Sequence, residues 1–354
     1  MKTFQSLLLF AAILAVMLTA CSGNGSKSTF SADNPNFAYI GRFDNADKAK
    51  PVFMYSGCAI RTIFEGTSAE LIMKDDSLRN LFTVIIDDSL FVITTNRTDS
   101  VYTLAEGLDN KMHTLEIIRR TEWHGGNTTF LGLRIDTGKK LLQPEMKDRR
   151  IEFIGDSYTC GYGNEGLSRE ENFRYDTENN YLTYGAITAR ALNAEYLTVC
   201  RSGIGIVQGY GGGRDFTMPA LYDEVTLNNP TPWDYSQYQP QLVVIDLGAN
   251  DLSAPLDSAE FVLAYVGFLK RIRSNYPSAK IVCCAGPSTP GKEWLTWRNY
   301  VLAVADLSGN TGTAVHYFEF STFEPNGSDW HPNVSEHKKM AEELIPFLQG
   351  LMNW

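Results

Sequence analysis

From about residue 35 to residue 145, short apolar runs alternate with polar turns, and no long helical pattern interrupts them. The runs are rich in Val, Ile, Phe and Thr, which favour strands, and Gly, Asn and Asp residues separate them. The candidate strands cover residues 37–43, 52–55, 59–64, 69–73, 81–86, 90–94, 101–104, 113–119 and 129–135. Many short strands at this spacing predict a β-sandwich or jelly-roll domain in residues 35–145.

The pattern changes at Ile151, where strand-like apolar runs begin to alternate with helix-like ones. The candidate strands here cover residues 151–154, 196–200, 242–247, 280–284 and 314–318. Between them, the apolar positions 261, 264, 265, 268, 269 and 272 keep helical spacing, and a last helix has such positions from 340 to 351. This alternation predicts an α/β domain over residues 150–354, with a mainly parallel sheet and flanking helices.

The N-terminus has the pattern of a secretory signal, because a positive start is followed by an almost wholly apolar stretch at residues 7–18. Leu18-Thr19-Ala20-Cys21 then resembles the lipobox of bacterial lipoproteins, in which a Cys after small residues receives lipid. We therefore expect a signal peptide at 1–20, lipidation of Cys21 and a flexible tether at 21–34. This predicts a protein of the bacterial cell envelope that is held to a membrane by lipid on Cys21. An ordinary secretory signal with an incidental Cys is the alternative.

The 354-residue chain has a formal net charge of -10 and no basic tract. Phosphate backbones attract clustered Lys and Arg, so nucleic acid is not an expected partner, and a neutral or cationic substrate fits better. If Cys21 carries lipid, five of the six cysteines remain, and an odd number argues against a full disulfide framework. No C-x-x-C or Cys/His cluster appears, and we expect neither a metal nor another cofactor.

Gly155-Asp156-Ser157 directly follows the first strand of the α/β region. A serine at the carboxyl end of such a strand lies where α/β folds keep their sites. Gly155 lets the backbone turn tightly, and the start of a helix can place N–H groups near Ser157 Oγ. This segment therefore predicts a nucleophile, although it differs from the G-x-S-x-G elbow of other hydrolases. The alternative is an ordinary turn in which Asp156 or Ser157 caps the helix.

Three further polar segments lie at strand ends or before the last helix. They are Arg201-Ser202-Gly203-Ile204-Gly205, Gly248-Ala249-Asn250-Asp251 and Asp329-Trp330-His331-Pro332. In a parallel sheet, these segments would gather with Ser157 at the carboxyl edge. A hydroxyl nucleophile, an imidazole base and neutral donors for an oxyanion are the groups of an acyl-transfer site. Taken singly, each has a structural alternative, since His331 can be a surface histidine and Asn250 can cap a turn.

Taken together, Gly-Asp-Ser at 155–157, the glycines at 203 and 205, Gly-x-Asn-Asp at 248–251 and the late His331 resemble the SGNH (GDSL-like) hydrolases. The mature chain, which also carries Gly41-Arg42-Phe43 in its β-domain, looks like carbohydrate esterase family 2. The resemblance implies a flavodoxin-like parallel sheet with flanking helices, preceded by an all-β jelly-roll domain. Members of this family are two-domain deacetylases of plant polysaccharides.

The resemblance implies a role for each matching residue. Ser157 would attack the ester carbonyl and form an acetyl-enzyme, and His331 would take the Ser157 proton and later activate water. The Ser157 N–H, the Gly203 N–H and the Asn250 side-chain amide would form the oxyanion hole, and losing one such donor typically costs about 2.7–4 kcal/mol. Gly205 can replace Gly203 in this set, because the two lie only two residues apart.

The chain departs from the superfamily at the group that orients His331. The wider superfamily usually has an Asp three residues before the His, where this chain has Ser328. Asp329 lies two residues before His331 and is one candidate orienter. In some relatives a backbone carbonyl orients the His, which would leave a Ser157–His331 dyad. A third group is needed only to set the tautomer and steady the imidazolium, and a carbonyl can do the first and part of the second.

Aromatic residues are frequent around these motifs. They are Tyr158, Tyr162, Tyr210, Trp294, Trp297 and Trp330. Sugars present C–H faces that stack on aromatic rings, and Trp330 adjoins His331, so we expect Trp330 to bind substrate. Trp294 and Trp297 lie three residues apart on a predicted helix, where a role in the core is the alternative.

These observations predict a serine esterase, similar to acetyl xylan esterases, that removes acetyl groups from acetylated polysaccharides or oligosaccharides such as xylan or glucomannan. A deacetylase of peptidoglycan or of other microbial glycans is a related alternative. A lipase or thioesterase would need a broad apolar acyl pocket, which the sequence does not show. A non-catalytic glycan-binding lipoprotein is the alternative from another class, and the intact Ser157, Asn250 and His331 argue against it.

Overall fold

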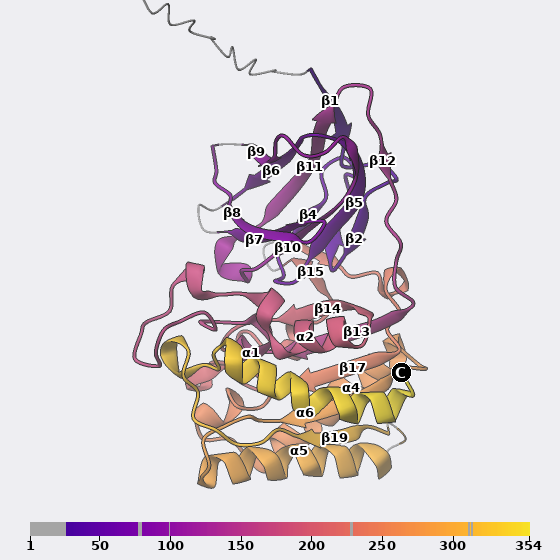
Figure 1. Cartoon of the computed structure of the whole chain (residues 1–354). Coiled ribbons are helices and arrows are strands. Elements are labelled where there is room, and N and C mark those ends of the chain that lie inside the picture. Colours follow the sequence, from indigo (N-terminus) through magenta and orange to yellow (C-terminus); the bar gives the residue numbers. More distant parts are fainter. Residues whose placement is uncertain (1–25, 77–79, 99, 227–228, 311, 313) are drawn as a thin grey trace, which may run out of the picture.

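The computed structural model of the chain describes residues 26–76, 80–98, 100–226, 229–310, 312 and 314–354 (Figure 1). The predicted signal peptide and the predicted lipidation site, Cys21, lie outside the described residues. In the part of the chain that is described, no helix is long and apolar enough to cross a membrane.

The first domain consists of two antiparallel sheets that pack face to face (Figure 1). One sheet has the order β3 (Phe43–Asp44), β4 (Val52–Phe53), β11 (Thr128–Asp136), β6 (Ala69–Asp75) and β9 (Val101–Ala105), with β1 (Lys27–Ser31) also paired to β11. The other has the order β12 (Leu141–Leu142), β5 (Ala59–Gly66), β10 (Lys111–Arg119), β7 (Leu81–Ile86) and β8 (Ser89–Thr94), with β2 (Ala38–Ile40) also paired to β5. Inward side chains of the two sheets, such as Met73 and Phe64, belong to one buried cluster. This arrangement is the predicted β-sandwich.

The sandwich begins earlier than the sequence predicts. Residues 26–34 fall within the predicted flexible tether, yet β1 pairs antiparallel with β11 from Lys27↔Asp136 to Ser31↔Gly132. Gly132 permits this approach, because a Cβ there would lie 2.1 Å from the Phe30 carbonyl oxygen. The tether prediction is therefore wrong for β1, whose polar outer positions gave it the composition of a linker.

The second domain is built on a five-stranded parallel sheet. Its spatial order is β14 (Ala194–Cys200), β13 (Arg149–Gly155), β17 (Leu242–Asp246), β18 (Lys280–Ala285) and β19 (His316–Glu319). Numbered along the chain, this order is 2-1-3-4-5, the flavodoxin-like order, and it reverses between β13 and β17. The predicted fold class, an α/β sheet preceded by an all-β domain, is confirmed.

Helices cover both faces of the parallel sheet (Figure 1). On one face, α2 (Tyr184–Ala191) and α6 (Val334–Met352) pack against inward side chains such as Phe153. On the other, α4 (Ser258–Asn275) and α5 (Lys292–Asn310) pack against side chains such as Ile154. Shorter elements complete the domain: α1 (Ser157–Cys160), α3 (Met218–Leu221), the hairpin β15 (Glu224–Thr226) and β16 (Asn229–Pro232), and 3₁₀ turns at Tyr175–Thr177, Asn180–Leu182, Tyr210–Gly212, Tyr235–Gln237, Asp251–Ser253 and Ser328–Trp330.

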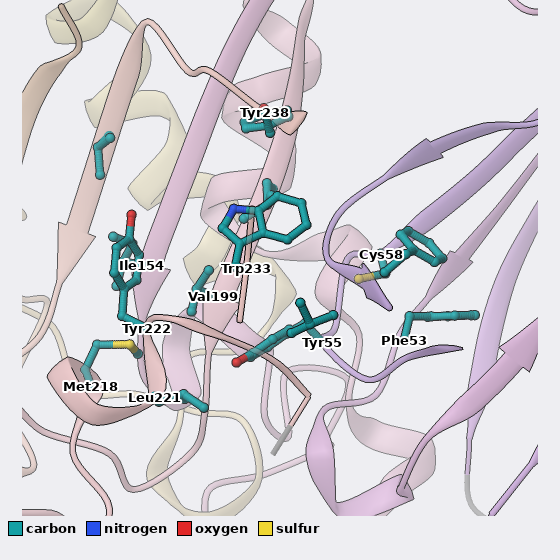
Figure 2. Packing of buried hydrophobic residues seen from close by; sticks show 14 of the residues in the cluster. Phe53, Tyr55, Cys58, Ile154, Val199, Met218, Leu221, Tyr222, Trp233 and Tyr238 are labelled. Atoms are coloured by element: carbon teal, nitrogen blue, oxygen red, sulfur yellow. The ribbon is translucent and has the colours of Figure 1, made fainter. Parts of the chain in front are cut away.

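The sandwich packs against the β14 side of the parallel sheet (Figure 1). The two domains share one buried hydrophobic cluster. Figure 2 shows Tyr55 and Cys58 of the sandwich near Val199 and Trp233 of the α/β domain. Gly57 lies where the domains approach closely, since a Cβ there would lie 2.6 Å from Asn180 Oδ1 and 2.9 Å from Thr198 Oγ1, and its φ of +82° also favours glycine. Thus the core of the protein is continuous across the domain boundary.

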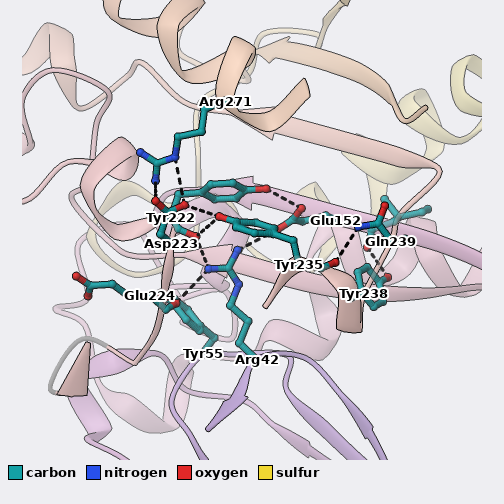
Figure 3. Close-up of polar contacts among 11 residues, drawn as sticks. Arg42, Tyr55, Glu152, Tyr222, Asp223, Glu224, Tyr235, Tyr238, Gln239 and Arg271 are labelled. Carbon is teal, nitrogen blue, oxygen red and sulfur yellow. Dashed lines mark hydrogen bonds and ion pairs between the residues drawn. The ribbon is translucent and has the colours of Figure 1, made fainter. Parts of the chain in front are cut away.

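A buried ion pair also crosses this boundary (Figure 3). Arg42 of the sandwich and Glu152 of β13 are both fully buried, with Arg42 Nη2 3.3 Å from Glu152 Oε1. The guanidinium also donates to the carbonyl oxygens of Tyr222 and Glu224, and it lies 5.0 Å from the centre of the Tyr222 ring. Tyr222 Oη donates to Glu152 Oε2 at 3.0 Å. Burial raises the pKa of Glu152, and the Arg42 charge opposes that shift.

Replacing Arg42 by Ala is expected to destabilise the protein by about 3–5 kcal/mol, because Glu152 would be left buried without its partner. Urea unfolding followed by circular dichroism measures this free energy. The matched control is Arg214→Ala, which removes the exposed Arg214–Glu260 pair and should leave the unfolding midpoint almost unchanged. Equal midpoints for the two variants would contradict this account of the interface.

Candidate active site

Ser157 lies at the carboxyl end of the central strand β13, where it begins the short helix α1. Gly155 is required at the turn, because a Cβ there would lie 2.0 Å from Thr159 Oγ1. The Asp156 carboxylate caps α1 by accepting the Tyr158 N–H at 3.1 Å. As the first residue of a helix, Ser157 has an N–H without an acceptor inside that helix.

His331 lies between a 3₁₀ turn (Ser328–Trp330) and the start of α6. Asp329 and Trp330 both have positive φ values, +50° and +60°, which side-chain-bearing residues rarely adopt. Backbone hydrogen bonds from the Asp329 N–H to Glu171 and from the Trp330 N–H to Arg169 hold this conformation. Strained backbone of this kind is concentrated at functional sites.

The two elements bring Ser157 and His331 into contact. His331 Nε2 lies 2.9 Å from Ser157 Oγ, although 174 residues separate them in the chain. Burial lowers the pKa of His331, and the nearby Asp329 opposes that shift. The imidazole is therefore neutral at pH 7, as a general base must be.

The main chain of Asp329, not its carboxylate, contacts His331. His331 Nδ1 lies 2.8 Å from the Asp329 carbonyl oxygen. The carboxylate instead accepts hydrogen bonds from Tyr162 Oη and the Phe173 N–H, both at 3.0 Å. A carbonyl oxygen only accepts hydrogen bonds, so it places the proton on Nδ1 and leaves Nε2 free to accept from Ser157. Of the two orienters that the sequence left open, the geometry favours the carbonyl and the Ser157–His331 dyad.

Gly203, rather than Gly205, faces Ser157. Gly203, Ser157, Asn250 and His331 line one cavity. The φ of Gly203 is +77°, and its carbonyl accepts the Tyr210 N–H at 2.8 Å. No acceptor for the Gly203 N–H is present among the described residues. Gly205 is turned towards Asp251, since a Cβ there would lie 2.4 Å from Asp251 Oδ2.

The Asn250 side chain lies beside Ser157, but both of its amide hydrogens already have acceptors. Asn250 Nδ2 donates to Asp156 Oδ2 at 2.9 Å and to the Ile204 carbonyl at 3.0 Å. Burial, reinforced by the negative charges of Asp251 and Glu122, raises the pKa of Asp156 to about 7. Because both Asn250 amide hydrogens are already donated, the amide can donate to a substrate oxygen only by sharing one of them.

The cleft around Ser157 consists of two adjoining cavities of about 450 and 520 Å³. Both are bordered by Tyr210 and Trp330, which are exposed residues with 78% and 55% of their surface accessible. One side of Trp330 lies against the Arg169 guanidinium, which is 4.7 Å from the ring centre. Trp297 lines the smaller cavity, although it is almost fully buried and donates to the Leu247 carbonyl. Its neighbour Trp294 also belongs to the hydrophobic core. A core role was the alternative that the sequence left open for both tryptophans.

The sandwich also helps to wall the cleft, through a residue that no motif in the sequence marks. The 3₁₀ turn η1 (Trp123–Gly125) places His124 on the wall of the larger cavity, with Asp329 and Trp330. The signal in the sequence is the segment Glu-Trp-His-Gly-Gly at 122–126, an acidic and aromatic turn in a β region. Whether this turn reaches the cleft depends on how the two domains pack, and the periodicity of the sequence does not reveal that packing.

A serine hydroxyl, a neutral imidazole and N–H groups that have no acceptor among the described residues thus meet where the strand order of a flavodoxin-like sheet reverses. Ser157 follows β13 and Asn250 follows β17, the two strands on either side of that point. Fold and site together define the class as a serine hydrolase.

Comparison with known proteins agrees with this class. Residues 39–144 match the model "Carbohydrate esterase 2 N-terminal", and residues 153–338 match the "GDSL-like Lipase/Acylhydrolase family". An "Acetylxylan esterase / glucomannan deacetylase" of Cellvibrio japonicus is 33% identical over 84% of this chain and 85% of its own length. The "Cellulase/esterase CelE" of Acetivibrio thermocellus is 39% identical over 91% of this chain, which spans only 40% of that protein's length.

Solved structures show the same relationship. A family two carbohydrate esterase from Clostridium thermocellum, solved in complex with cellohexaose, is 38% identical, with a TM-score of 0.86 over 90% of this chain and 99% of that one. Another, from Cellvibrio japonicus, is 28% identical, with a TM-score of 0.88 over 93% of this chain and 99% of that one. The chain belongs to the GDSL-like lipase/acylhydrolase family and, within it, to carbohydrate esterase family 2. The resemblance seen in the sequence is confirmed.

The Asp329→Asn variant is expected to keep kcat for an aryl acetate within about tenfold of the wild type, since the carbonyl that contacts His331 is retained. Asn also tolerates the positive φ at this position, and its side-chain oxygen can still accept from Tyr162. A carboxylate that orients the catalytic His directly is worth about 10⁴-fold in kcat. A loss of that size in folded Asp329→Asn would show that the carboxylate, not the carbonyl, supports His331.

Proposed function

We propose that this protein is a serine esterase that removes O-acetyl groups from polysaccharides such as xylan or glucomannan. The observation that carries the proposal is the 2.9 Å contact between Ser157 Oγ and His331 Nε2, inside a cleft that Gly203 and Asn250 also line. The nucleophile, its base and the donors for an oxyanion are thus present at one point of the cleft.

In the first half of the reaction, Ser157 Oγ attacks the acetyl carbonyl carbon while His331 Nε2 takes the hydroxyl proton. The negative charge that develops on the acetyl oxygen is stabilised by the N–H groups of Ser157 and Gly203 and by the shared Asn250 amide. The ester C–O bond then breaks, and His331 returns its proton to the departing sugar oxygen. The acetyl group remains on Ser157.

In the second half, a water molecule replaces the sugar. His331 takes a proton from this water as its oxygen attacks the acetyl-enzyme, and it then protonates Ser157 Oγ as acetate leaves. Throughout, the Asp329 carbonyl accepts the Nδ1–H, which keeps the ring in one tautomer and stabilises the imidazolium.

A glycan substrate fits the shape and the charge of the cleft. The cavities are open, and the exposed rings of Tyr210 and Trp330 border them, which suits stacking against the C–H faces of sugars. The net charge of -10 is compatible with a neutral polysaccharide. The Cellvibrio japonicus relatives are named for deacetylation of xylan and glucomannan.

Acetate release from acetylated xylan, acetylated glucomannan and an aryl acetate tests this function. Wild type should release acetate from the aryl ester and from at least one polymer, and Ser157→Ala should lose both activities. Release that survives in Ser157→Ala would place the nucleophile elsewhere. A folded wild type that is inactive on all three esters would contradict the esterase itself.

We further propose that Cys21 carries lipid and holds the enzyme in a bacterial cell envelope, because Leu18-Thr19-Ala20-Cys21 resembles a lipobox. The first described strand, β1, begins at Lys27, so five residues at most would separate the lipid-bearing Cys21 from the sandwich. Labelling with a radioactive fatty acid in a bacterial host should mark the wild type and not Cys21→Ser. Equal labelling of both, or labelling of neither in cells that process other lipoproteins, would contradict the anchor.

A further inference from the structure

Two consecutive residues of the sandwich contact two consecutive residues of the loop that follows β14. The Glu122 carboxylate accepts hydrogen bonds from Ser202, and the Trp123 ring lies against Arg201, whose guanidinium carbon is 4.4 Å from the ring centre. The next residue of that loop is Gly203, a proposed oxyanion donor. The sandwich therefore holds the loop immediately before Gly203.

The Glu122 carboxylate links this loop to the nucleophile turn. Its Oε2 accepts the Ser202 N–H at 2.7 Å and the Cys160 Sγ–H at 3.4 Å, and its Oε1 accepts the Ser202 Oγ–H. Cys160 ends α1, the helix that Ser157 begins. One carboxylate thus fixes the distance between the two segments that carry the Ser157 and Gly203 N–H groups.

Burial makes this arrangement costly unless the contacts are kept. The Glu122 side chain is 0% exposed, and a buried carboxylate needs hydrogen bonds or a nearby positive charge. Arg201 supplies the positive charge. Burial lowers the pKa of Arg201, and the negative charge of Glu122 opposes that shift, which shows that the two groups attract each other. The positive guanidinium also offsets the unfavourable effect that the Glu122 charge would have on a nearby oxyanion.

Gly203 needs such support because a glycine has little conformational preference of its own. Its φ is +77°, and a Cβ there would meet only Tyr210 Cβ, at 3.9 Å, so neighbouring atoms do not confine it. Hydrogen bonds on either side confine it instead: Glu122 holds Ser202, and the Tyr210 N–H holds the Gly203 carbonyl. A displacement of about 1 Å at a reacting centre can cost about 10²-fold in rate.

We propose that Glu122 of the β-sandwich is a positioning residue for catalysis, which holds Ser202 so that the Gly203 N–H points at the acetyl oxygen. The inference rests on the proposed esterase function and assigns the N-terminal domain a part in it. Glu122 does not touch the substrate; it acts through the loop.

The test compares Glu122→Ala and the isosteric Glu122→Gln, each alone and combined with Gly203→Ala. Gly203→Ala should displace the residue 203 N–H without any change at Glu122, because the φ of +77° at this position disfavours a side chain. With an aryl acetate as substrate, Glu122→Ala should lower kcat by about 10- to 100-fold and leave KM nearly unchanged, as expected for an interaction that matters in the transition state. Glu122→Gln keeps an acceptor for the Ser202 N–H and should recover much of the loss. In the Gly203→Ala background, both substitutions should change kcat by less than about twofold.

Glu195→Gln is the matched control. Glu195 is also a buried carboxylate at the domain boundary, where Arg61 donates to it at 2.7 Å, but it lies at the opposite end of β14. This variant should lower the melting temperature without lowering kcat.

Two results would overturn the proposal: folded Glu122→Ala with wild-type kcat, or the same fold-loss from Glu122→Ala in both Gly203 backgrounds. If Glu122→Ala does not fold, Glu122→Asp, whose shorter side chain cannot keep the same hydrogen bonds to Ser202, takes its place in the same comparison. Wild type without activity on the aryl acetate would instead refute the esterase function, and the proposal with it.

Discussion

Strand β13 and the short helix after it carry two side chains on which the rest of the structure depends. Glu152, in the middle of the strand, forms the fully buried ion pair with Arg42 and thereby joins the sandwich to the parallel sheet. Ser157 begins the helix that follows this strand. A buried ion pair is weak evidence for stability, because removing two charges from water costs nearly as much as their attraction returns. Here the ion pair fixes how the two domains pack, since the acceptors of the Arg42 guanidinium all belong to the α/β domain.

This packing of the two domains explains why the cleft contains parts of both. The α/β domain supplies Ser157, Gly203, Asn250 and His331 from the carboxyl edge of its sheet, as its strand order requires. The sandwich supplies His124 to the wall of the cleft and Glu122 to the loop behind it. Backbone hydrogen bonds hold the segment before His331, and the Glu122 carboxylate holds the loop before Gly203, so neither loop needs the side chains of Ser157 or His331 to keep its conformation. The N-terminal domain is therefore a structural part of the site and not a separate module beside it.

The sequence predicts most of this fold because burial leaves a local trace. Strands with one buried face alternate, as in β5, and strands buried on both faces, such as β17, read as continuous apolar runs. Ser157, Asn250 and His331 could be selected together because parallel strands bring their carboxyl ends to one edge. β1 was missed because most of its residues are polar or only partly buried, so its pairing with β11 has no periodic signal.

Other features of the site depend on three-dimensional packing and leave no such trace. The choice of the Asp329 carbonyl over its carboxylate follows from two residues with positive φ, which no pattern of apolar positions predicts. Likewise, the sequence shows Glu122 only as an acidic residue in a β region. Its contact with Ser202 becomes visible only when the sandwich packs against the loop after β14. The choice of Gly203 over Gly205 was open for the same reason, because it depends on which way the loop turns towards Asp251.

The proposed esterase activity depends most on Ser157 being the nucleophile that His331 activates. The most direct measurement is inactivation with a fluorophosphonate, followed by mass-spectrometric mapping of the modified peptide. The account predicts one phosphonyl group per molecule, on Ser157, formed in step with the loss of esterase activity, and very slow modification of His331→Ala. Full loss of activity with the phosphonyl group on another residue, or full activity with Ser157 modified, would contradict it.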